Sequence, residues 1–241
     1  MKKEKILPVS EVFYSIQGEG QTMGVLAVFL RLGGCNLLCE SKNWVCDTLE
    51  VWRKSKATEF KDILNEEMID AIISKKAHLV FTGGEPLLHQ AQIIEYLNWF
   101  EKVYQFLPTI EIETNGTINP DLYFINYHDI YFNISPKLST AGEQNHRNVR
   151  INPDVLIGLS FASHNVKPIF KFVISCAEDI KELEDDFLQY LDKRKVVLMP
   201  AGSSVDELHE TRQMVIDLCK TKGFRFSDRL HIVAWNKKTG V

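Results

Sequence analysis

Residues 79–86 read LVFTGGEP, a short apolar run that passes directly into a glycine-rich turn closed by proline. The β-branched and aromatic residues favour a strand over 79–82. The Gly-Gly pair and Pro86 favour a turn at the carboxyl end of that strand. The stretch therefore predicts a buried strand with a polar, glycine-rich turn at its end.

The same arrangement recurs along the chain. Other apolar or aromatic runs predict strands over 25–32, 109–114, 130–134, 169–174, 196–199 and 231–235. Helical spacing separates most of these runs, and the capping residues Asn65 and Ser204 precede two of the expected helices. Strands that alternate with helices predict βαβ units and a mostly parallel sheet.

Polar clusters follow nearly every expected strand. They are the runs GGC (33–35), TGGEP (82–86), ETNGT (113–117), SPK (135–137) and MPAG (199–202). The carboxyl ends of parallel strands share one face, which is where α/β sheets and barrels bind their ligands. About six such units are fewer than a closed eight-stranded barrel needs. We therefore predict an α/β fold, an open or partial (β/α)6 barrel, as a single domain over residues 1–241.

The composition excludes several classes of protein. Of the 241 residues, 45% are hydrophobic and 25% are charged, which is ordinary for a globular protein and excludes disorder. The 28 Lys and Arg against 32 Asp and Glu give a net charge of −4, so we expect no nucleic-acid or membrane partner. No segment reaches the ~20 apolar residues of a membrane span, and no apolar run follows residues 1–5 as in a signal peptide. We therefore expect a cytoplasmic protein, in which thiols stay reduced.

Three of the five cysteines fall close together, at Cys35, Cys39 and Cys46. In a reducing compartment such a cluster indicates a metal site rather than disulfides. Three thiolates suit an iron–sulfur cluster that leaves one iron open, whereas structural zinc needs a fourth ligand such as His78 or His89. Neither histidine has a partner at zinc-finger spacing. The spacing favours an iron–sulfur cluster over zinc.

The remaining two cysteines are predicted to pack in the core. Cys219 shares a helical face with Val215 and Leu218, and Cys176 follows an apolar strand. Free cysteine is among the most buried residue types, so neither residue requires a functional explanation.

Charged side chains within apolar strands need partners. Arg31 ends such a strand, and its planar fork suits a carboxylate, either of a ligand or of one of the chain's own acids. Glu111 and Glu113 share one face of their strand. If that face points into the barrel, Glu113 can accept hydrogen bonds from a ligand. An ion pair of Glu113 with Lys137 or Lys171 is the alternative.

The cysteine loop and the GGEP run together resemble the radical S-adenosylmethionine superfamily. More narrowly, nearly the whole chain is similar to the 7-carboxy-7-deazaguanine synthase family. The matching runs are SIQGEG (15–20), RLGGC (31–35), CDT (46–48), TGGEP (82–86), ETNGT (113–117), SPK (135–137) and WNKKTGV (235–241). The usual superfamily spacing is C-x3-C-x2-C, whereas this chain has C-x3-C-x6-C, which implies about four extra residues around 41–43.

The resemblance implies a barrel of the radical S-adenosylmethionine type with one 4Fe-4S cluster on Cys35, Cys39 and Cys46. S-adenosylmethionine would bind the open iron. The resemblance implies contacts of this cofactor with Val45, Asp47, Gly84, Glu85, Ser135, Pro136, Lys137, Met199, Pro200, Ala201 and Gly202. Gly83 and Gly84 permit the close backbone approach that carbonyl contacts with the cofactor's ammonium group require.

The implied substrate is 6-carboxy-5,6,7,8-tetrahydropterin, which is converted to 7-carboxy-7-deazaguanine with loss of ammonia in queuosine or other deazapurine biosynthesis. The implied substrate contacts are Ile16, Gln17, Gly18, Arg31, Thr82 and Val241, and our interpretation of the strand face adds Glu113. The resemblance also implies Mg²⁺ on the hydroxyl of Thr48, with water and substrate oxygen as its other ligands. It further implies a homodimer and an external electron donor such as flavodoxin. Two alternatives stay open: another radical S-adenosylmethionine enzyme, such as a glycyl-radical activase, and a non-catalytic zinc-binding module.

Overall fold

A computed structural model describes residues 5–40, 46, 49–238 and 240. Within this part the strands are β1 (Ile6–Ile16), β2 (Leu26–Leu32), β3 (Lys56–Glu59), β4 (His78–Gly83), β5 (Ile110–Thr114), β6 (Ile130–Ile134), β7 (Val166–Ile174), β8 (Val196–Pro200) and β9 (Arg225–Phe226). The helices are α1 (Leu49–Trp52), α2 (Glu66–Ile73), α3 (Gln90–Tyr104), α4 (Leu122–Ile125), α5 (Arg147–Arg150), α6 (Pro153–Ser160), α7 (Asp179–Glu182), α8 (Val205–Lys222) and α9 (Leu230–Trp235). Short 3-10 turns join several of them.

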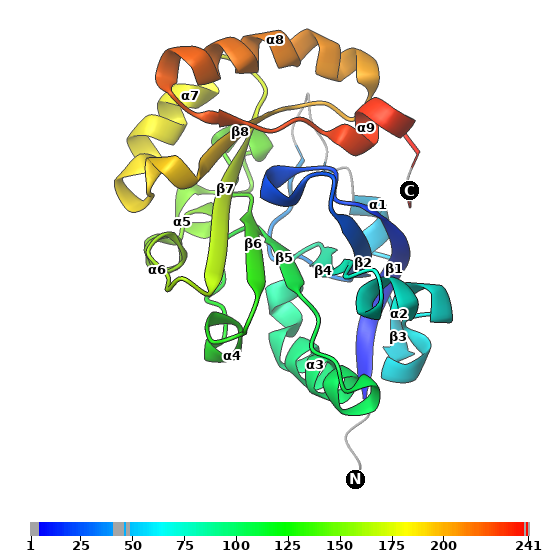
Figure 1. The fold of residues 1–241 in the computed structure, drawn as a ribbon. Coiled ribbons are helices and arrows are strands. Elements are labelled where there is room, and N and C mark those ends of the chain that lie inside the picture. Colours follow the sequence, from blue (N-terminus) through cyan, green and yellow to red (C-terminus); the bar gives the residue numbers. More distant parts are fainter. Residues whose placement is uncertain (1–4, 41–45, 47–48, 239, 241) are drawn as a thin grey trace.

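The strands of the described residues form one sheet in the order β3-β1-β2-β4-β5-β6-β7-β8-β9. From β2 to β9 every neighbouring pair is parallel, whereas β1 is antiparallel to both β2 and β3. The sheet curves without closing, and helices α3, α4 and α6 lie on its outer side (Figure 1). The predicted open α/β barrel is therefore confirmed.

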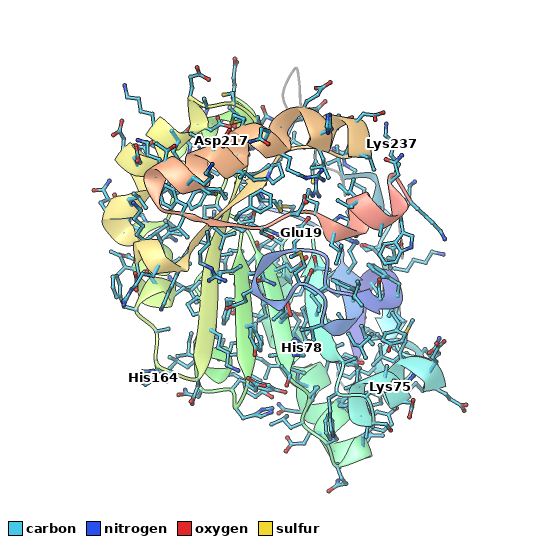
Figure 2. All side chains as sticks on the ribbon, turned by 45° about the horizontal axis from the view of Figure 1, so that its top comes forward. Glu19, Lys75, His78, His164, Asp217 and Lys237 are labelled. Carbon is cyan, nitrogen blue, oxygen red and sulfur yellow. The ribbon has the colours of Figure 1, made fainter. Side chains whose placement is uncertain are left out.

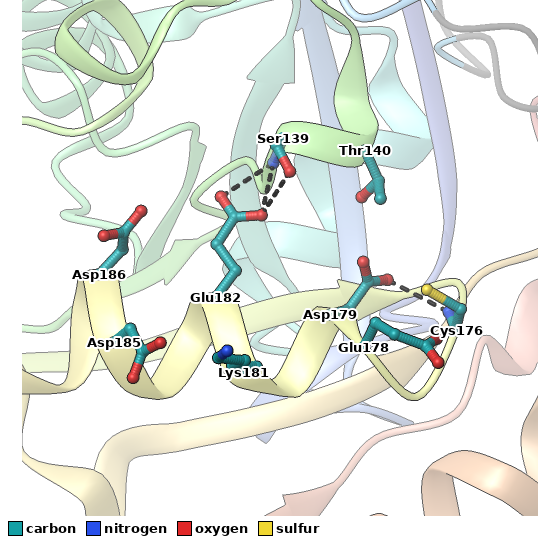
Figure 3. Close-up of a pocket in the computed structure, with 9 residues that line it drawn as sticks. All are labelled: Ser139, Thr140, Cys176, Glu178, Asp179, Lys181, Glu182, Asp185 and Asp186. Atoms are coloured by element: carbon teal, nitrogen blue, oxygen red, sulfur yellow. Dashed lines mark hydrogen bonds between the residues drawn. The ribbon is translucent and has the colours of Figure 1, made fainter.

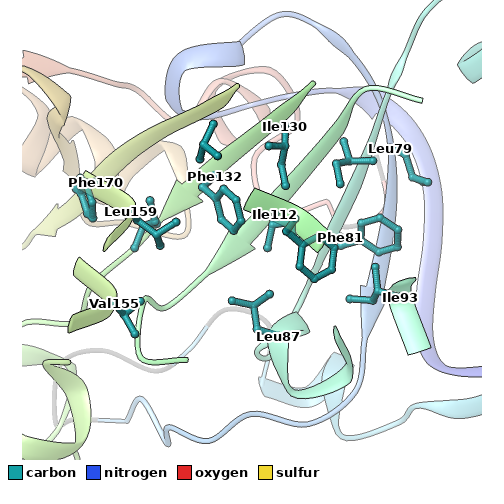
Figure 4. Packing of buried hydrophobic residues seen from close by; sticks show 14 of the residues in the cluster. Leu79, Phe81, Leu87, Ile93, Ile112, Ile130, Phe132, Val155, Leu159 and Phe170 are labelled. Atoms are coloured by element: carbon teal, nitrogen blue, oxygen red, sulfur yellow. The ribbon is translucent and has the colours of Figure 1, made fainter. Parts of the chain in front are cut away.

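Alternation along the strands separates an apolar outer face from a polar inner face. The outer residues, such as Phe81, Ile112 and Phe132, are fully buried beneath the helices (Figure 4). Burial of a side chain of this size contributes about 1.5–3 kcal/mol. The residues between them point the other way, because successive side chains of a strand face opposite sides of the sheet. The outer face thus holds the fold together, and the inner face is left for polar side chains.

Most predicted strands are confirmed, and one is wrong. The run 130–134 is β6 with the predicted bounds, and 79–82 lies within β4. Residues 231–235, predicted as a strand, belong to helix α9. Only Ile232 of this helix is buried, and the edge of the sheet beside β8 is already taken by β9.

Both predicted helix caps are confirmed. The Asn65 side chain accepts a hydrogen bond from the backbone N–H of Met68 at the start of α2. The Ser204 hydroxyl accepts one from the N–H of Glu207 at the start of α8. Such a cap satisfies an N–H that would otherwise have no partner in the first turn of a helix. Among the helices of the described residues, none has the length and apolar character that crossing a membrane requires.

Candidate active site

A cavity of about 600 Å³ opens on the inner face at the carboxyl ends of the strands. We call it the main cavity. It is lined by many of the residues singled out from the sequence: Ile16, Gln17, Gly18, Arg31, Cys35, Cys39, Cys46, Thr82, Gly84, Glu113, Ser135, Lys137 and Met199. These residues come from separate stretches of the chain. The parallel strands β2, β4, β5, β6 and β8 bring their carboxyl ends to one edge, whereas residues 16–18 follow β1, which is antiparallel to β2.

The cysteine loop follows β2 and returns upon itself. The backbone N–H of Cys46 donates to the carbonyl of Cys39 at 2.9 Å, which joins the second and third cysteines across the longer spacing. Buried Leu37 and Cys39 pack with Ala141, and Cys35 and Cys46 pack against this group. Burial raises the pKa of the Cys35 thiol to about 11, so a metal must displace a proton to bind there.

The GGEP turn packs against the cysteine loop with no room for a side chain. A Cβ added to Gly84 would lie 2.0 Å from the carbonyl oxygen of Gly34 and 2.8 Å from Cβ of Cys35. The backbone N–H of Glu85 donates to the same Gly34 oxygen at 2.9 Å. Glycine is therefore required at position 84, because two backbone segments meet there. The turn and the loop form a single unit at the cavity wall.

Glu85 lies beneath the turn, outside the lining of the cavity, and is 1% exposed. Its carboxylate accepts hydrogen bonds from the backbone N–H groups of Leu87 and Asn115 and from the Thr114 hydroxyl. Burial raises the pKa of Glu85 to about 7, although these donors act in the opposite direction. Glu85 therefore joins the end of β4 to the end of β5, and its carboxylate faces the protein rather than the cavity.

Four inner-face residues form a polar row across neighbouring strands. Arg31 of β2 pairs in register with Thr82 of β4, and Glu113 of β5 pairs with Asn133 of β6. The Thr82 hydroxyl donates to Glu113 Oε2 at 2.6 Å, and this hydrogen bond joins the Arg31–Thr82 pair to the Glu113–Asn133 pair. Arg31 Nε donates to Glu11 Oε2 at 3.2 Å. Glu113 lines the main cavity, and its hydrogen bonds go to Thr82 and to Gln17.

Gln17 connects this row to a second, deeper carboxylate. Its Nε2 donates to Glu111 Oε2 at 3.0 Å and to Glu113 Oε1 at 3.1 Å. Glu111 is fully buried, and it also accepts from Asn133 Nδ2 at 2.7 Å and lies 3.0 Å from His78 Nδ1. His78 is the first residue of β4 and lies toward the amino-terminal end of the parallel strands (Figure 2). Gln17 is thus held in one orientation by two glutamates.

Sequence reasoning assigned no role to a cluster of charges around Glu19, which is labelled in Figure 2. Glu19 forms ion pairs with Lys171 and Arg229, and His231 Nε2 lies 3.8 Å from its Oε1. Burial alone would raise the pKa of Glu19, but the charges of Lys171, Arg229 and His231 hold that pKa well below its usual range. Lys171 within the apolar run 169–174 was the available signal. Its partner 152 residues away was not visible in one sequence.

Several predicted residues lie outside this arrangement. Pro136, Pro200, Ala201 and Gly202 do not line the main cavity as the structure describes it. The carbonyls of Ala201 and Gly202 accept hydrogen bonds from Thr211 and Arg229. The predictions for Val45, Asp47, Thr48 and Val241 fall outside the described residues. Gly240 does line the cavity, near Glu11.

The geometry does not favour a zinc site. His78 contacts Glu111, and His89 Nε2 lies 2.7 Å from the carbonyl oxygen of Gly33. Nowhere in the described ranges do three His, Cys, Asp or Glu side chains converge as the ligands of one metal ion. In a cubane cluster each cysteine binds a different iron, so its thiols surround a volume rather than a point. Three thiols around one cavity match that requirement.

A second cavity, of about 400 Å³, lies at α7 (Figure 3). Its acidic side chains are hydrogen-bonded within the protein: Glu182 accepts from Ser139, and Asp179 accepts from the backbone N–H of Cys176. The prediction of a packing role was right for Cys219, which is buried in the core, and wrong for Cys176. Cys176 is half-buried because it lines this second cavity.

The thiol loop and the open α/β barrel define a radical S-adenosylmethionine enzyme with one iron–sulfur cluster. In agreement, the family described as "4Fe-4S single cluster domain" matches residues 16–152. The crystal structure of QueE from Escherichia coli superposes with a TM-score of 0.64 over 96% of this chain and 100% of that chain, at 23% sequence identity, and so shares the fold.

Curated relatives define the particular family. The 7-carboxy-7-deazaguanine synthase of Pyrobaculum aerophilum is 34% identical over 235 residues, which are 96% of this chain and 96% of that protein. The synthase of Halobacterium salinarum is 32% identical over 249 residues, covering 95% of this chain and 91% of the relative. The chain belongs to the 7-carboxy-7-deazaguanine synthase family. Neither the zinc-binding module nor the glycyl-radical activase is favoured.

Proposed function

We propose that the protein converts 6-carboxy-5,6,7,8-tetrahydropterin to 7-carboxy-7-deazaguanine, with loss of ammonia, in the main cavity. The observation that carries this proposal is the convergence of the cysteine loop, the GGEP turn and the polar row on one cavity of about 600 Å³. Pockets of roughly 300–1,000 Å³ are typical of small-molecule and cofactor sites. The family membership of the chain supports the same reaction.

Cys35, Cys39 and Cys46 would hold three irons of the cluster, and the absence of a fourth thiol among the cavity's lining residues leaves one iron for S-adenosylmethionine. When bound, the cluster supplies the electron that cleaves the cofactor's sulfonium. Gly83 and Gly84 line the cavity, so backbone groups of the turn are within reach of a bound cofactor. Lys137, whose Nζ donates to the Ser135 hydroxyl at 2.9 Å, also lines the cavity.

Arg31 is the proposed partner of the substrate carboxylate. Its Nε is engaged by Glu11, and among the described residues its two Nη groups have no recorded partner. The pair with Glu11 fixes Nε of the guanidinium, and Arg31 lines the main cavity. A guanidinium binds a carboxylate through parallel hydrogen bonds of fixed geometry.

Glu113 and Thr82 are proposed to contact the pterin edge. Glu113 accepts hydrogen bonds from Thr82 and Gln17, and a carboxylate has about four acceptor sites, so it can also accept from an amino group or ring N–H. Because the amide of Gln17 is engaged by Glu111 and Glu113, its contribution is to fix Glu113. The backbone of Ile16 and Gly18 would complete this wall.

Further parts of the proposal rest on the family resemblance. They are Mg²⁺ on Thr48, closure of the substrate site by Val241, a flavodoxin-like electron donor, a homodimer and a single domain. A cytoplasmic location fits a site that needs reduced thiols. Thr48→Ala should weaken the dependence of turnover on Mg²⁺ while cleavage of S-adenosylmethionine continues. An unchanged response to the metal would refute the role of Thr48.

The test is anaerobic reconstitution followed by turnover. The wild-type protein should bind about four irons per chain and consume the carboxypterin with S-adenosylmethionine and dithionite. Arg31→Gln should raise KM for the pterin by about 10- to 100-fold, because it loses charge-assisted hydrogen bonds. Arg194→Gln is the matched control, since Arg194 is exposed and pairs with Asp192. A colourless protein, or one that leaves the carboxypterin unchanged, would overturn the proposal.

A further inference from the structure

A buried amide outside the main cavity contacts the cysteine loop. Asn145 is 5% exposed and lies just before α5. Its Oδ1 accepts from the backbone N–H of Leu38 at 3.1 Å, and its Nδ2 donates to the Leu38 carbonyl at 2.8 Å. The same Nδ2 donates to Sγ of Cys39 at 3.8 Å. One side chain therefore fixes both backbone groups of Leu38 and the sulfur of the next residue.

We propose that Asn145 is a positioning residue for Cys39 that also makes the cluster easier to reduce. The inference rests on the proposed function, in which Cys39 is a ligand of the cluster. Reduction adds negative charge, part of which resides on the cysteine sulfurs, and hydrogen bonds to those sulfurs are among the factors that set cluster potentials. An N–H directed at Cys39 stabilises the reduced state more than the oxidised state. The buried setting strengthens this effect, because little water competes for the sulfur.

The segment that carries Asn145 is anchored at both ends, which lets it hold the loop. Arg150 is 6% exposed, donates to the carbonyl of Lys137 at 3.0 Å and pairs with Glu182 at 2.7 Å. Glu182 also accepts from the backbone and hydroxyl of Ser139. The two ends of the stretch that carries Asn145 are thus fixed by contacts outside the cysteine loop.

The neighbouring residue supplies a matched control. Gln144 is exposed, and its Nε2 donates to the carbonyls of Leu38 and Glu40 at 2.6 and 2.8 Å. Within the described residues it has no recorded contact with a sulfur atom. Gln144→Ala therefore removes backbone contacts to the same loop and leaves the hydrogen bond to Cys39 in place.

The experiment measures the midpoint potential of the reconstituted cluster by EPR-monitored titration, without turnover. Asn145→Ala removes all three hydrogen bonds, whereas Asn145→Asp keeps an acceptor for Leu38 and removes the N–H donors. Both variants should lower the ratio of reduced to oxidised cluster at a fixed potential by about three- to tenfold. A tenfold change corresponds to about 59 mV for a one-electron couple. Gln144→Ala should retain the wild-type potential.

The outcomes separate the inference from the function on which it rests. If the wild-type protein forms no cluster, the proposed function fails. If all four proteins share one potential and one iron content, only the role of Asn145 fails. Loss of iron from both Asn145 variants, with wild-type circular dichroism and full iron in Gln144→Ala, supports the positioning role. A shift in Gln144→Ala equal to that in the Asn145 variants would overturn the role of the sulfur contact.

Discussion

Gly84→Ala tests the idea that the cluster loop and the GGEP turn are built as one unit. The new methyl group would lie 2.0 Å from the carbonyl oxygen of Gly34, whereas real Cβ contacts are essentially never shorter than 3.0 Å. One of the two backbone segments must therefore move by at least about 1 Å. Such a move also strains the hydrogen bond from the N–H of Glu85 to that oxygen.

The expected loss of stability follows from these contacts. Overpacking against well-ordered backbone costs about 1–3 kcal/mol, and loss of one intramolecular hydrogen bond costs about 1 kcal/mol more. Gly84→Ala should therefore lower the free energy of unfolding by about 2–4 kcal/mol, a large fraction of the total stability of an ordinary domain. Because Cys35 lies 2.8 Å from the added carbon, the variant should also bind less iron.

Urea unfolding of the metal-free protein and iron analysis after reconstitution measure the two effects separately. Gly158→Ala is the control, since a Cβ at this position within α6 meets nothing within 4 Å. It should leave iron content unchanged and stabilise the helix by up to about 1 kcal/mol. A Gly84→Ala protein with the wild-type urea midpoint and full iron content would refute the reasoning.

Three further predictions concern buried polar groups. Because burial raises the pKa of Glu85 from 4.5 to about 7, the folded state holds the proton of this carboxyl more tightly than the unfolded state does, and the stability of the wild-type protein should fall as pH rises between these values. Glu85→Gln should flatten that part of the profile of urea-unfolding free energy against pH. An unchanged slope would contradict the raised pKa of Glu85. Lys171→Met should cost about 3 kcal/mol, because it removes one of the three cationic neighbours that Glu19 has among the described residues and leaves Arg229 and His231. Since the folded pKa of Glu19 is depressed, this cost should be present above pH 4.5 and shrink in more acidic solution, and a cost that does not vary with pH would count against the pair. Tyr96→Phe should be neutral or stabilise the protein by up to about 1 kcal/mol, because the Tyr96 hydroxyl is buried without a hydrogen-bond partner among the described residues. Destabilisation by more than about 1 kcal/mol in thermal unfolding would show that the hydroxyl has a hydrogen-bond partner.

Local signals in the sequence predicted the fold well where a single stretch carries its own pattern. The apolar run 130–134 and the helix starts at Asn65 and Ser204 needed no distant partner to be recognised. The run 231–235 misled because a short apolar segment has the same composition in a strand as in a helix. Strand β9 occupies the edge of the sheet beside β8, so residues 231–235 have no place there as a strand. Strand β1 escaped notice because nearly all its residues are half-buried and mix polar with apolar types.

The candidate site was predictable as a set of strand ends but not as a network. Sequence position placed Thr82 and Glu113 at one edge of the sheet, and the structure adds the hydrogen bond that joins them. The buried contacts of Glu111 and Glu19 depend on residues about 100 to 200 positions away in the chain. Such pairings arise from sheet order and register, which periodicity along one chain does not determine.

The unusual cysteine spacing shows why spacing alone is a weak guide to such a site. Extending a loop from two to six residues costs about 1 kcal/mol in closure entropy, because that cost grows only with the logarithm of length. The hydrogen bond from the N–H of Cys46 to the carbonyl of Cys39 contributes a similar amount and holds the backbone of Cys46 beside that of Cys39. Extra residues between these cysteines therefore need not displace the third thiol. Gly84 has no such freedom, since even one added carbon meets backbone atoms of the loop. The contact between turn and loop constrains the site more tightly than the number of residues between its thiols.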